Sequence, residues 1–268
     1  MGLKEKITIP KLKEMKKSRE KIACLTAYDW LTAKLLDEAG IDLILVGDSG
    51  AMVFAGHETT LPITVDQMIY HTQAVSRGVK RALLIADMPF LSFQVSPEEA
   101  LLNAGRFLKE GGADGVKIEG GEAMAKTAQK LVQVGIPVMG HIGLTPQSIR
   151  TFGGYRLRGK RPNEAKELKR DAKIMEEAGI FAIVLEKIPT PLAKEITQTL
   201  SVPTIGIGAG SACDGQILVT HDMLGLFEAF KPKFVRRYAE LGQSIRRAVE
   251  KYSKEVKEGK YPSPEESY

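Results

Sequence analysis

Short runs of apolar residues recur along the chain, and a polar stretch with helical periodicity follows most of them. Such runs predict β-strands, and the stretches between them predict helices. Regular alternation of the two is typical of βα units that build a parallel sheet with right-handed crossovers. The predicted strands cover residues 22–29, 42–49, 82–88, 116–121, 138–143, 180–187, 204–207 and 216–219.

Turn and cap residues mark the helices between these strands. Thr64 suits a helix N-cap, Ser96-Pro97-Glu98-Glu99 has the order of a capping box, and Gly40 suits a helix C-terminus. Residues 50–62 and 145–160 are polar, contain glycine and are predicted to be loops. The predicted helices cover residues 31–40, 64–80, 96–111, 122–134, 163–179 and 190–199, with further helices up to about residue 257.

Eight such units in 268 residues fit a closed (β/α)8 barrel, the TIM barrel, and a doubly wound sheet is the alternative. We predict a single α/β domain over residues 1–268, with a basic N-terminal arm or short helix over about 1–21 and a polar tail over about 258–268. Active sites of such barrels lie at the carboxyl ends of the strands. The polar residues at those ends are therefore the candidates for function.

The strand over residues 116–121 has the most informative pattern. Val116 and Ile118 are apolar, whereas Lys117 and Glu119 are charged and share the opposite face. Unpaired charges inside a fold are costly, so this pair indicates a site. We expect it to meet the polar residues that end other strands, which are Asp48, Ser49, Asp87, His141 and Glu186.

Three of these residues suggest a metal ion. Asp48, Asp87 and Glu119 would repel one another strongly at one barrel mouth unless a cation joined them. Ligand sets made only of oxygen suit magnesium, calcium or manganese rather than zinc. The alternative for a single aspartate at a strand end is a cap on the following turn.

The other polar strand ends each allow a catalytic role and a structural one. Lys117 could pair with a substrate carboxylate or enolate oxygen, or form a buried ion pair. His141 could donate a hydrogen bond to developing negative charge, or be structural. Glu186 could act as a general base or form a salt bridge with Lys187. Ser49 could contact substrate or cap a turn.

A glycine-rich segment follows the seventh predicted strand. Residues 206–210 read Gly-Ile-Gly-Ala-Gly, which could cradle a phosphate at a position where barrels often bind one. The segment lacks the lysine of a Walker motif and the position of a dinucleotide fingerprint. A tight turn that lets a ligand approach is the alternative.

Composition and charge narrow the function classes. The chain is 43% hydrophobic and 26% charged, as expected for a globular domain. A net charge of +5 could steer anionic small molecules, but no base-reading motif accompanies it, so we expect no nucleic-acid partner. No apolar run approaches the roughly 20 residues of a membrane helix, so we expect no membrane partner. Cys24 and Cys213 indicate reduced thiols in a cytoplasmic protein.

A series of ordered motifs runs along the chain. They are Thr26-Ala-Tyr-Asp29, Val46-Gly-Asp-Ser49, Thr60-Leu-Pro-Ile-Thr64, Ala86-Asp-Met-Pro-Phe90, Val116-Lys-Ile-Glu-Gly-Gly121, Gly140-His-Ile-Gly-Leu-Thr-Pro-Gln147, Gly153-Gly-Tyr155, Ile205-Gly-Ile-Gly-Ala-Gly210 and Val219-Thr-His-Asp-Met-Leu-Gly-Leu-Phe227. Taken together, these motifs resemble those of the ketopantoate hydroxymethyltransferases (3-methyl-2-oxobutanoate hydroxymethyltransferases), from about residue 21 to 239. Two sites depart from the family pattern: Gly50-Ala51 stands where Leu-Gly is common, and Trp30-Leu31 where Tyr-Pro is usual. These departures concern loop shape and folate contacts.

The resemblance implies a TIM barrel and a defined reaction. A hydroxymethyl group passes from 5,10-methylenetetrahydrofolate to 3-methyl-2-oxobutanoate, which gives ketopantoate for pantothenate and coenzyme A synthesis. By motif match, Asp48, Asp87 and Glu119 would hold Mg²⁺, some of them through water. The 2-oxo and carboxylate oxygens of the substrate would chelate the same ion.

The resemblance also implies roles for the remaining residues. Glu186 would be the general base that removes the proton at C3, and His141 would assist at the substrate oxygens. The family is typically a homodecamer, and the basic N-terminal arm is a reasonable subunit contact. The residues expected to bind the 2-oxo acid are Asp48, Ser49, Asp87 and Lys117.

Two other functions fit the same residues. A magnesium barrel enzyme of the isocitrate lyase and phosphoenolpyruvate mutase group would turn over 2-oxo acids without folate. The lyases use a catalytic cysteine, and neither Cys24 nor Cys213 lies in a matching motif. A non-catalytic 2-oxo-acid sensor would bind its ligand with magnesium and would not need Glu186.

Overall fold

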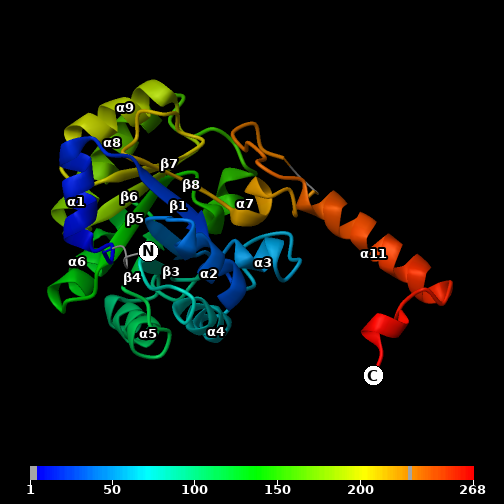
Figure 1. The fold of residues 1–268 in the computed structure, drawn as a ribbon. Coiled ribbons are helices and arrows are strands. Elements are labelled where there is room, and N and C mark those ends of the chain that lie inside the picture. Colours follow the sequence, from blue (N-terminus) through cyan, green and yellow to red (C-terminus); the bar gives the residue numbers. More distant parts are fainter. Residues whose placement is uncertain (1–4, 229–230) are drawn as a thin grey trace. The chain divides into compact units, whose positions relative to one another are not determined.

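The computed structural model describes residues 5–228 and 231–268, and its eight strands close into one barrel (Figure 1). Each strand pairs in parallel with the next one along the chain, and β8 returns to pair with β1. The predicted TIM barrel is confirmed, and the doubly wound alternative is wrong. The strands are β1 Ile22–Thr26, β2 Leu43–Val46, β3 Leu83–Asp87, β4 Gly115–Glu119, β5 Val138–Gly143, β6 Ala182–Glu186, β7 Thr204–Ile207 and β8 Gly215–Leu218.

Within residues 5–219, the helices lie outside the ring of strands (Figure 1). Two of the predicted caps begin them: Thr64 forms a complete capping box with Gln67, and Ser96 accepts a hydrogen bond from the Glu99 N–H at 3.1 Å. The α-helices are α1 Ile9–Ser18, α2 Trp30–Glu38, α3 Gly50–Val53, α4 Val65–Ser76, α5 Pro97–Lys109, α6 Ala125–Gln133, α7 Ile149–Phe152, α8 Pro162–Glu177, α9 Thr190–Thr199, α10 Thr220–Met223 and α11 Leu241–Lys257, and the 3-10 helices are η1 Glu122–Met124, η2 Pro146–Ser148 and η3 Pro264–Glu266.

Both segments predicted to be loops contain helical turns, so those predictions are wrong in part. The helix α3 lies within residues 50–62, and η2 and α7 lie within residues 145–160. A helix of a single turn is too short to show a helical period in the sequence. Such turns form here because the surrounding barrel fixes the two ends of each connection.

The chain divides into two compact units, residues 1–219 and residues 220–268. The first unit is the barrel with its helices. The second contains α10, the 17-residue helix α11 and η3. A single domain over the whole chain therefore stays a prediction. The predicted basic arm begins within residues 1–4, which lie outside the described residues.

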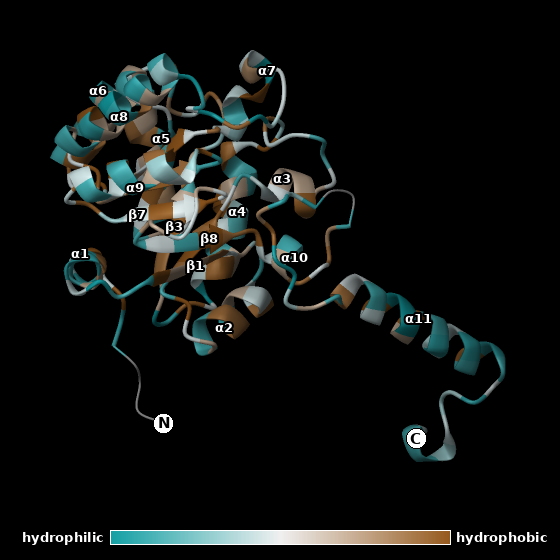
Figure 2. Cartoon of the chain, turned by 90° about the horizontal axis from the view of Figure 1, so that it is seen from above, coloured by the Kyte–Doolittle hydropathy of each residue, from teal (hydrophilic) through white to brown (hydrophobic). Residues whose placement is uncertain are grey.

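The amino end of the barrel is filled by apolar side chains. Inward-facing residues of the strands form one buried cluster, and Ile7, Leu12 and Met15 of the N-terminal segment pack into it. Figure 2 shows the same division, with mainly hydrophobic strands at the centre and hydrophilic residues along the surrounding helices. The strand residues of the cluster include Ile22, Cys24, Leu43, Leu45, Leu83, Ile85, Met139, Ala182, Val184, Ile205 and Ile217. The predicted short helix is thus α1, and it closes this end of the barrel.

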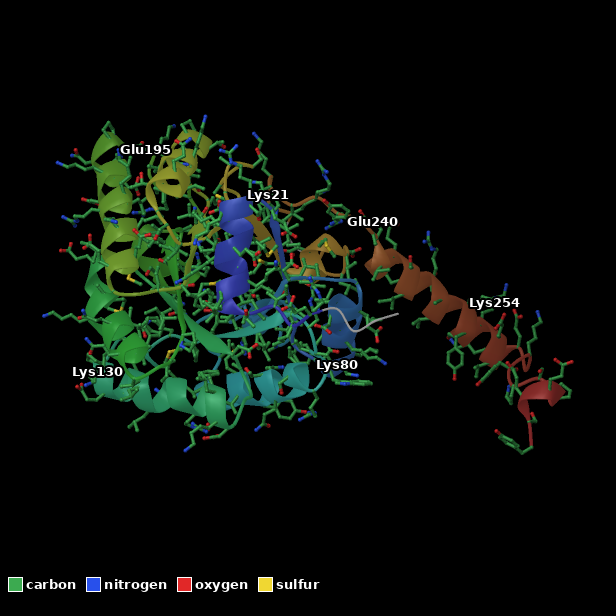
Figure 3. All side chains as sticks on the ribbon, turned by 60° about the vertical axis from the view of Figure 1, so that its left-hand side comes forward. Lys21, Lys80, Lys130, Glu195, Glu240 and Lys254 are labelled. Carbon is green, nitrogen blue, oxygen red and sulfur yellow. The ribbon has the colours of Figure 1, made fainter. Side chains whose placement is uncertain are left out.

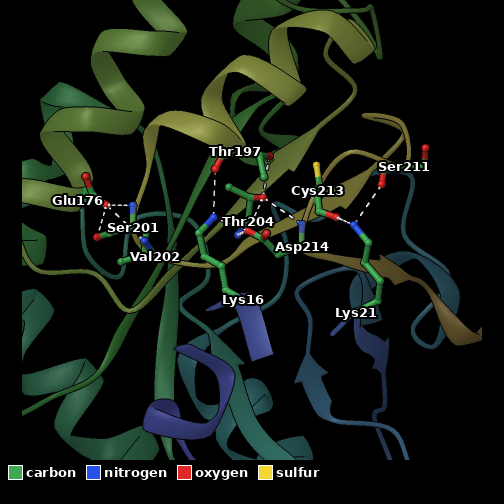
Figure 4. Close-up of polar contacts among 10 residues, drawn as sticks. All are labelled: Lys16, Lys21, Glu176, Thr197, Ser201, Val202, Thr204, Ser211, Cys213 and Asp214. Carbon is green, nitrogen blue, oxygen red and sulfur yellow. Dashed lines mark hydrogen bonds and ion pairs between the residues drawn. The ribbon is translucent and has the colours of Figure 1, made fainter. Parts of the chain in front are cut away.

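Lysines of the N-terminal segment bind acceptors at the same end (Figure 4). Lys16 Nζ lies 2.7 Å from Asp214 Oδ2 and donates to the Thr197 carbonyl at 3.0 Å. Lys21 Nζ donates to the carbonyls of Ser211 and Cys213. These positive charges serve the chain's own barrel, and a role of the arm as a subunit contact stays a prediction.

Other charged side chains lie on the outer surface. Figure 3 shows Lys130 on α6 and Glu195 on α9 pointing away from the barrel. Glu195 forms an exposed ion pair with Lys169, whose Nζ lies 2.8 Å from its Oε1. Exposed pairs of this kind contribute little to stability, so the informative charges are the buried ones.

Candidate active site

The carboxyl end of the barrel is lined by charged residues instead of apolar ones. Asp87, Lys117, Glu119 and His141 are all buried, and Asp48, immediately after β2, is buried with them. The register of the sheet makes neighbours of Asp87 and Lys117, and likewise of Glu119 and His141. Side chains on one face of adjacent strands lie within contact distance, so opposite charges meet in pairs.

Lys117 lies between two carboxylates. Its Nζ is 2.8 Å from Asp87 Oδ1 and 3.8 Å from Glu119 Oε1, and the lysine is 4% exposed. Despite the opposing effect of burial, Asp87 and Glu119 raise the pKa of Lys117, so it remains protonated. The buried ion pair that the sequence left open for Lys117 is therefore present, and it is made with Asp87 on the neighbouring strand.

His141 lies between Glu186 and the group formed by Lys117, Asp87 and Glu119. Its Nδ1 lies 3.3 Å from Glu119 Oε1, and its Nε2 lies 3.3 Å from Glu186 Oε2. Although burial and Lys117 oppose protonation, the two glutamates raise the pKa of His141 to about 9. Nδ1 also lies 3.1 Å from Lys117 Nζ, and since a lysine ammonium only donates, Nδ1 accepts in this contact and the ring presents its N–H to Glu186 from Nε2.

Asp48 and Asp87 form a close pair of acids. The backbone N–H of Asp48 donates to Asp87 Oδ2 at 3.0 Å, which places the Asp87 carboxylate beside the main chain of Asp48. Burial, followed by the charges of Asp87 and Glu119, raises the pKa of Asp48 well above its ordinary range. Burial also raises the pKa of Asp87, although Lys117 acts against it. Both carboxyl groups therefore bind a proton more readily than in water, and a bound cation would favour their charged form.

Ser49 lies beside this cluster and has a partner that the sequence did not reveal. Its Oγ is 2.8 Å from the hydroxyl of Tyr28, a side chain that is only 1% exposed. A Cβ at Gly50 would come within 2.9 Å of the Tyr28 ring. The absence of a side chain at position 50 thus lets the ring lie against the start of α3 and hold the serine.

The glycine-rich segment 206–210 begins in β7, which Gly206 and Ile207 complete, and then bends. Gly208 and Gly210 have φ of 63° and 88°, values that favour glycine, and the chain continues through turns directly into β8. A phosphate site of the usual kind needs a helix N-terminus after the glycines. This connection leads to the strand β8 and has no such helix, and the tight turn that lets a ligand approach stays a prediction.

A protein-family model described as ketopantoate hydroxymethyltransferase matches residues 6–264. The chain belongs to this family. A 3-methyl-2-oxobutanoate hydroxymethyltransferase of Prosthecochloris aestuarii (strain DSM 271 / SK 413) is 59% identical over 266 residues, which cover 98% of this chain and 96% of that protein. The expectation from sequence of an enzyme of this family is confirmed.

Solved structures of other enzymes share the fold. A 2,3-dimethylmalate lyase, a member of the PEP mutase/isocitrate lyase superfamily, has a TM-score of 0.61 at 18% identity and covers 96% of this chain and 92% of that one. Phosphonopyruvate hydrolase with oxalate and Mg++ has a TM-score of 0.62 at 14% identity, with coverage of 96% and 92%. At such identities the likeness concerns the fold alone. The lyase and mutase alternative thus shares the barrel, while the family match separates this chain from it.

Gln147 is the main residue of this hydroxymethyltransferase site that the sequence did not single out. It lies in η2, its amide donates to Asp48 Oδ2 at 3.0 Å, and its backbone N–H donates to Glu119 Oε2 at 2.9 Å. Its position at the end of the motif Gly140-His-Ile-Gly-Leu-Thr-Pro-Gln147 was the available signal. A glutamine in a connecting segment gives no pattern that indicates where its side chain points.

The protein side chains alone do not form a ready metal cage. Within residues 5–228 and 231–268, no three His, Cys, Asp or Glu side chains are grouped so that they could hold a metal ion. Lys117 lies between Asp87 and Glu119, which explains the separation of the carboxylates.

Within residues 5–228 and 231–268, no helix is both long and apolar enough to cross a membrane.

The donor set nevertheless fits a hard divalent cation. The four carboxyl groups of the cluster, those of Asp48, Asp87, Glu119 and Glu186, outnumber its two basic side chains, Lys117 and His141. One or two carboxylates with water and substrate oxygens are what Mg²⁺ usually takes, and Asp48 and Asp87 could supply them. Glu119 Oε2 accepts a hydrogen bond from the Gln147 N–H, whereas its buried Oε1 accepts none and lies 3.3 Å from His141 Nδ1.

Proposed function

We propose that this enzyme transfers a hydroxymethyl group from 5,10-methylenetetrahydrofolate to 3-methyl-2-oxobutanoate and so forms ketopantoate. Relatives that are 54–59% identical over 98% of the chain carry the name of this activity. The observation that carries the proposal is the buried set of charges at the barrel mouth. It joins a carboxylate pair, a lysine, a histidine and a second glutamate within hydrogen-bond or ion-pair distance.

Mg²⁺ is part of the proposal. Asp48 and Asp87 would bind it, and Glu119, whose Oε2 accepts from the Gln147 N–H, would reach it through water. When bound, the ion would supply Lewis-acid stabilisation of the negative charge that develops on the 2-oxo oxygen of the substrate. The solved phosphonopyruvate hydrolase of the same fold is a complex with oxalate and Mg++.

Glu186 is the proposed general base. Its side chain is 14% exposed, against 3–4% for the other charged groups of the cluster, so it is the member most open to a ligand. His141 Nε2 holds Glu186 Oε2 at 3.3 Å. We assign the C3 proton of the substrate to the other oxygen, Oε1. Lys117 and Ser49 would bind the substrate oxygens, and the resulting carbanion would attack the one-carbon unit of the folate.

The family resemblance also supports assembly and location. We propose a homodecamer and a cytoplasmic enzyme, in keeping with the two buried free cysteines, Cys24 and Cys213. The residues that bind folate are left unassigned.

Proton NMR of 3-methyl-2-oxobutanoate in deuterated buffer, with no folate present, tests the base and the metal together. We expect the C3 proton signal to disappear with Mg²⁺ and to persist with a chelator. Glu186→Gln should slow the exchange by about 10²–10⁴-fold, the usual contribution of a general base. Glu195→Gln, an exposed glutamate on α9, is the matched control and should behave as the wild type.

The outcomes distinguish the competing functions. Adding the folate donor should convert the exchanging substrate into ketopantoate. Exchange followed by cleavage of 2-oxo acids without folate would instead indicate the lyase and mutase type of reaction. Magnesium-dependent binding without exchange would indicate a sensor, and the role of Glu186 would be withdrawn.

A further inference from the structure

Gln147 makes four hydrogen bonds at the carboxyl end of the barrel and is 6% exposed. Its Nε2 donates to Asp48 Oδ2 at 3.0 Å and to the Met88 carbonyl at 3.0 Å. Its Oε1 accepts from Gln94 Nε2 at 2.9 Å, and its backbone N–H donates to Glu119 Oε2 at 2.9 Å. Both amide hydrogens, the amide oxygen and the main-chain donor are therefore used.

These partners fix the orientation of the amide. A flipped amide would place Oε1 against the Asp48 carboxylate and the Met88 carbonyl, where acceptor would face acceptor. It would also place Nε2 against the donating amide of Gln94. Only one orientation satisfies all the partners, so the side chain acts as a rigid spacer.

The spacer joins separate elements. Asp48 follows β2, Met88 follows β3 and Glu119 ends β4, while Gln147 itself lies on η2 after β5. Gln94, from the connection between β3 and α5, supports the amide from behind. The relative position of the Asp48 and Glu119 carboxylates is thus set by one residue through two separate donors.

We propose that Gln147 is a positioning residue that fixes the distance and orientation of the Asp48 and Glu119 carboxylates for the cation, with Gln94 holding its amide in place. The inference rests on the proposed Mg²⁺ role of these carboxylates. A neutral amide suits the task because it donates two hydrogen bonds without adding charge. A lysine or arginine at this position would add a further positive charge that competes with the metal.

Gln147→Met tests the proposal, because it keeps the length of the side chain and removes both amide donors while the backbone N–H to Glu119 stays. We expect the Kd for Mn²⁺, measured without substrate by the EPR signal of the free ion, to rise about 10–100-fold, as for other residues that orient metal ligands. The thermal midpoint of the metal-free protein reports any purely structural loss.

Two further glutamine variants make the result decisive. Gln94→Met removes the contact behind the amide but leaves Gln147 bound to Asp48, so we expect a smaller, several-fold rise in the Mn²⁺ Kd. Gln73→Met removes a comparable hydrogen bond, from Gln73 Nε2 to the Glu110 carbonyl on the outer helices, and should leave the Kd unchanged. If Gln147→Met does not fold, Gln94→Met decides alone.

Different results would overturn the positioning role of Gln147 and the proposed role of the metal. An Mn²⁺ Kd within twofold of the wild type in folded Gln147→Met, or in Gln94→Met where it decides alone, would overturn the positioning role and leave the proposed function intact. A lowered thermal midpoint with unchanged Kd would also overturn it, because that is the effect of packing alone. If the wild type itself binds no Mn²⁺ or Mg²⁺, the metal part of the proposed function fails first.

Discussion

The two ends of the barrel use the same chemical groups in different ways. At the amino end, Asp42, Asp114 and Asp214 each directly precede a strand. Each accepts a hydrogen bond from a backbone N–H of the neighbouring strand, those of Ala23, Leu84 and Thr204 respectively. Each also pairs with one cation: Asp42 with Arg81, Asp114 with Lys6, and Asp214 with Lys16, at 2.7–2.9 Å.

At the carboxyl end, the acids outnumber the cations. Lys117 and His141 serve Asp87, Glu119 and Glu186, and Asp48 adds a further carboxylate. The paired side chains of Asp87 and Lys117 are each 4% exposed, against 14% and 16% for Lys16 and Asp214. Deeper burial strengthens every charge interaction and raises the cost of any charge that is not balanced.

The difference shows which end is built for a ligand. At the amino end, each aspartate has one cation and a backbone N–H as partners, so these carboxylates stabilise the fold without a bound ligand. Buried carboxylates without matching cations are unfavourable, and a bound metal cation would relieve this cost. The carboxyl end is therefore expected to bind a cation. The predictions below test whether this contrast, and not burial alone, separates the two ends.

The largest expected effect comes from a matched pair of lysine variants. Lys117→Met leaves Asp87 buried without its cation, which should cost about 3 kcal/mol and lower the thermal midpoint by about 6–12 °C. Lys16→Met breaks a shallower pair and should cost about 1 kcal/mol, or about 2–4 °C. Thermal unfolding of both variants in a chelator provides the measurement.

Mg²⁺ sharpens this comparison. It should recover part of the loss in Lys117→Met, because it replaces the missing positive charge, and it should not recover the loss in Lys16→Met. Equal losses in the two variants, both insensitive to Mg²⁺, would show that the two ends differ only in location.

A pair of aspartate variants tests the excess of acid directly. Saturating Mg²⁺ should stabilise the wild type by about 2.7 kcal/mol at one hundred times its Kd. Asp48→Asn keeps the shape of the side chain and removes one charge, so we expect most of this stabilisation to disappear. Asp42→Asn at the amino end should lower the thermal midpoint itself but retain the full Mg²⁺ response. The reverse assignment of the two responses would place the metal elsewhere.

Much of this arrangement could be predicted from the sequence. Apolar runs bounded by glycine and proline located the strands to within a few residues, and the alternation of Val116, Lys117, Ile118 and Glu119 placed the two charges on the inner face. The apolar runs are reliable because a barrel strand is buried on both of its faces. The bounds of β5, β7 and α9 agree fully with the prediction.

The partners of these residues could not be predicted in the same way. The sequence placed Lys117 and Glu119 on one face but named no partner for a buried ion pair of Lys117. Its shortest ion pair is with Asp87, a contact set by the register of β3 against β4. Register depends on the closure of the whole barrel. The same holds for Gln147 and Tyr28, whose roles arise from segments distant in sequence that the barrel brings together.

The smallest effect we predict concerns Glu176 of α8, which lies at the amino end of the barrel (Figure 4). Its Oε1 accepts hydrogen bonds from the Ser201 N–H at 2.6 Å and the Ser201 hydroxyl at 2.7 Å, and Lys173 pairs with its Oε2. Although burial acts in the opposite direction, these partners lower the pKa of Glu176 from its ordinary 4.5 to about 2.

A lowered pKa in the folded state means that the carboxylate stabilises the protein above pH 4.5 and that this contribution disappears as the pH falls toward about 2. Glu176→Gln should therefore lower the thermal midpoint at neutral pH and flatten its dependence on pH within that window. Because the pair is already matched by protein groups, Mg²⁺ should leave both curves unchanged. If the thermal midpoint of the variant depended on pH as steeply as that of the wild type, other carboxylates would control acid unfolding. The proposed contribution of the matched Glu176 contacts at the amino end would then be withdrawn.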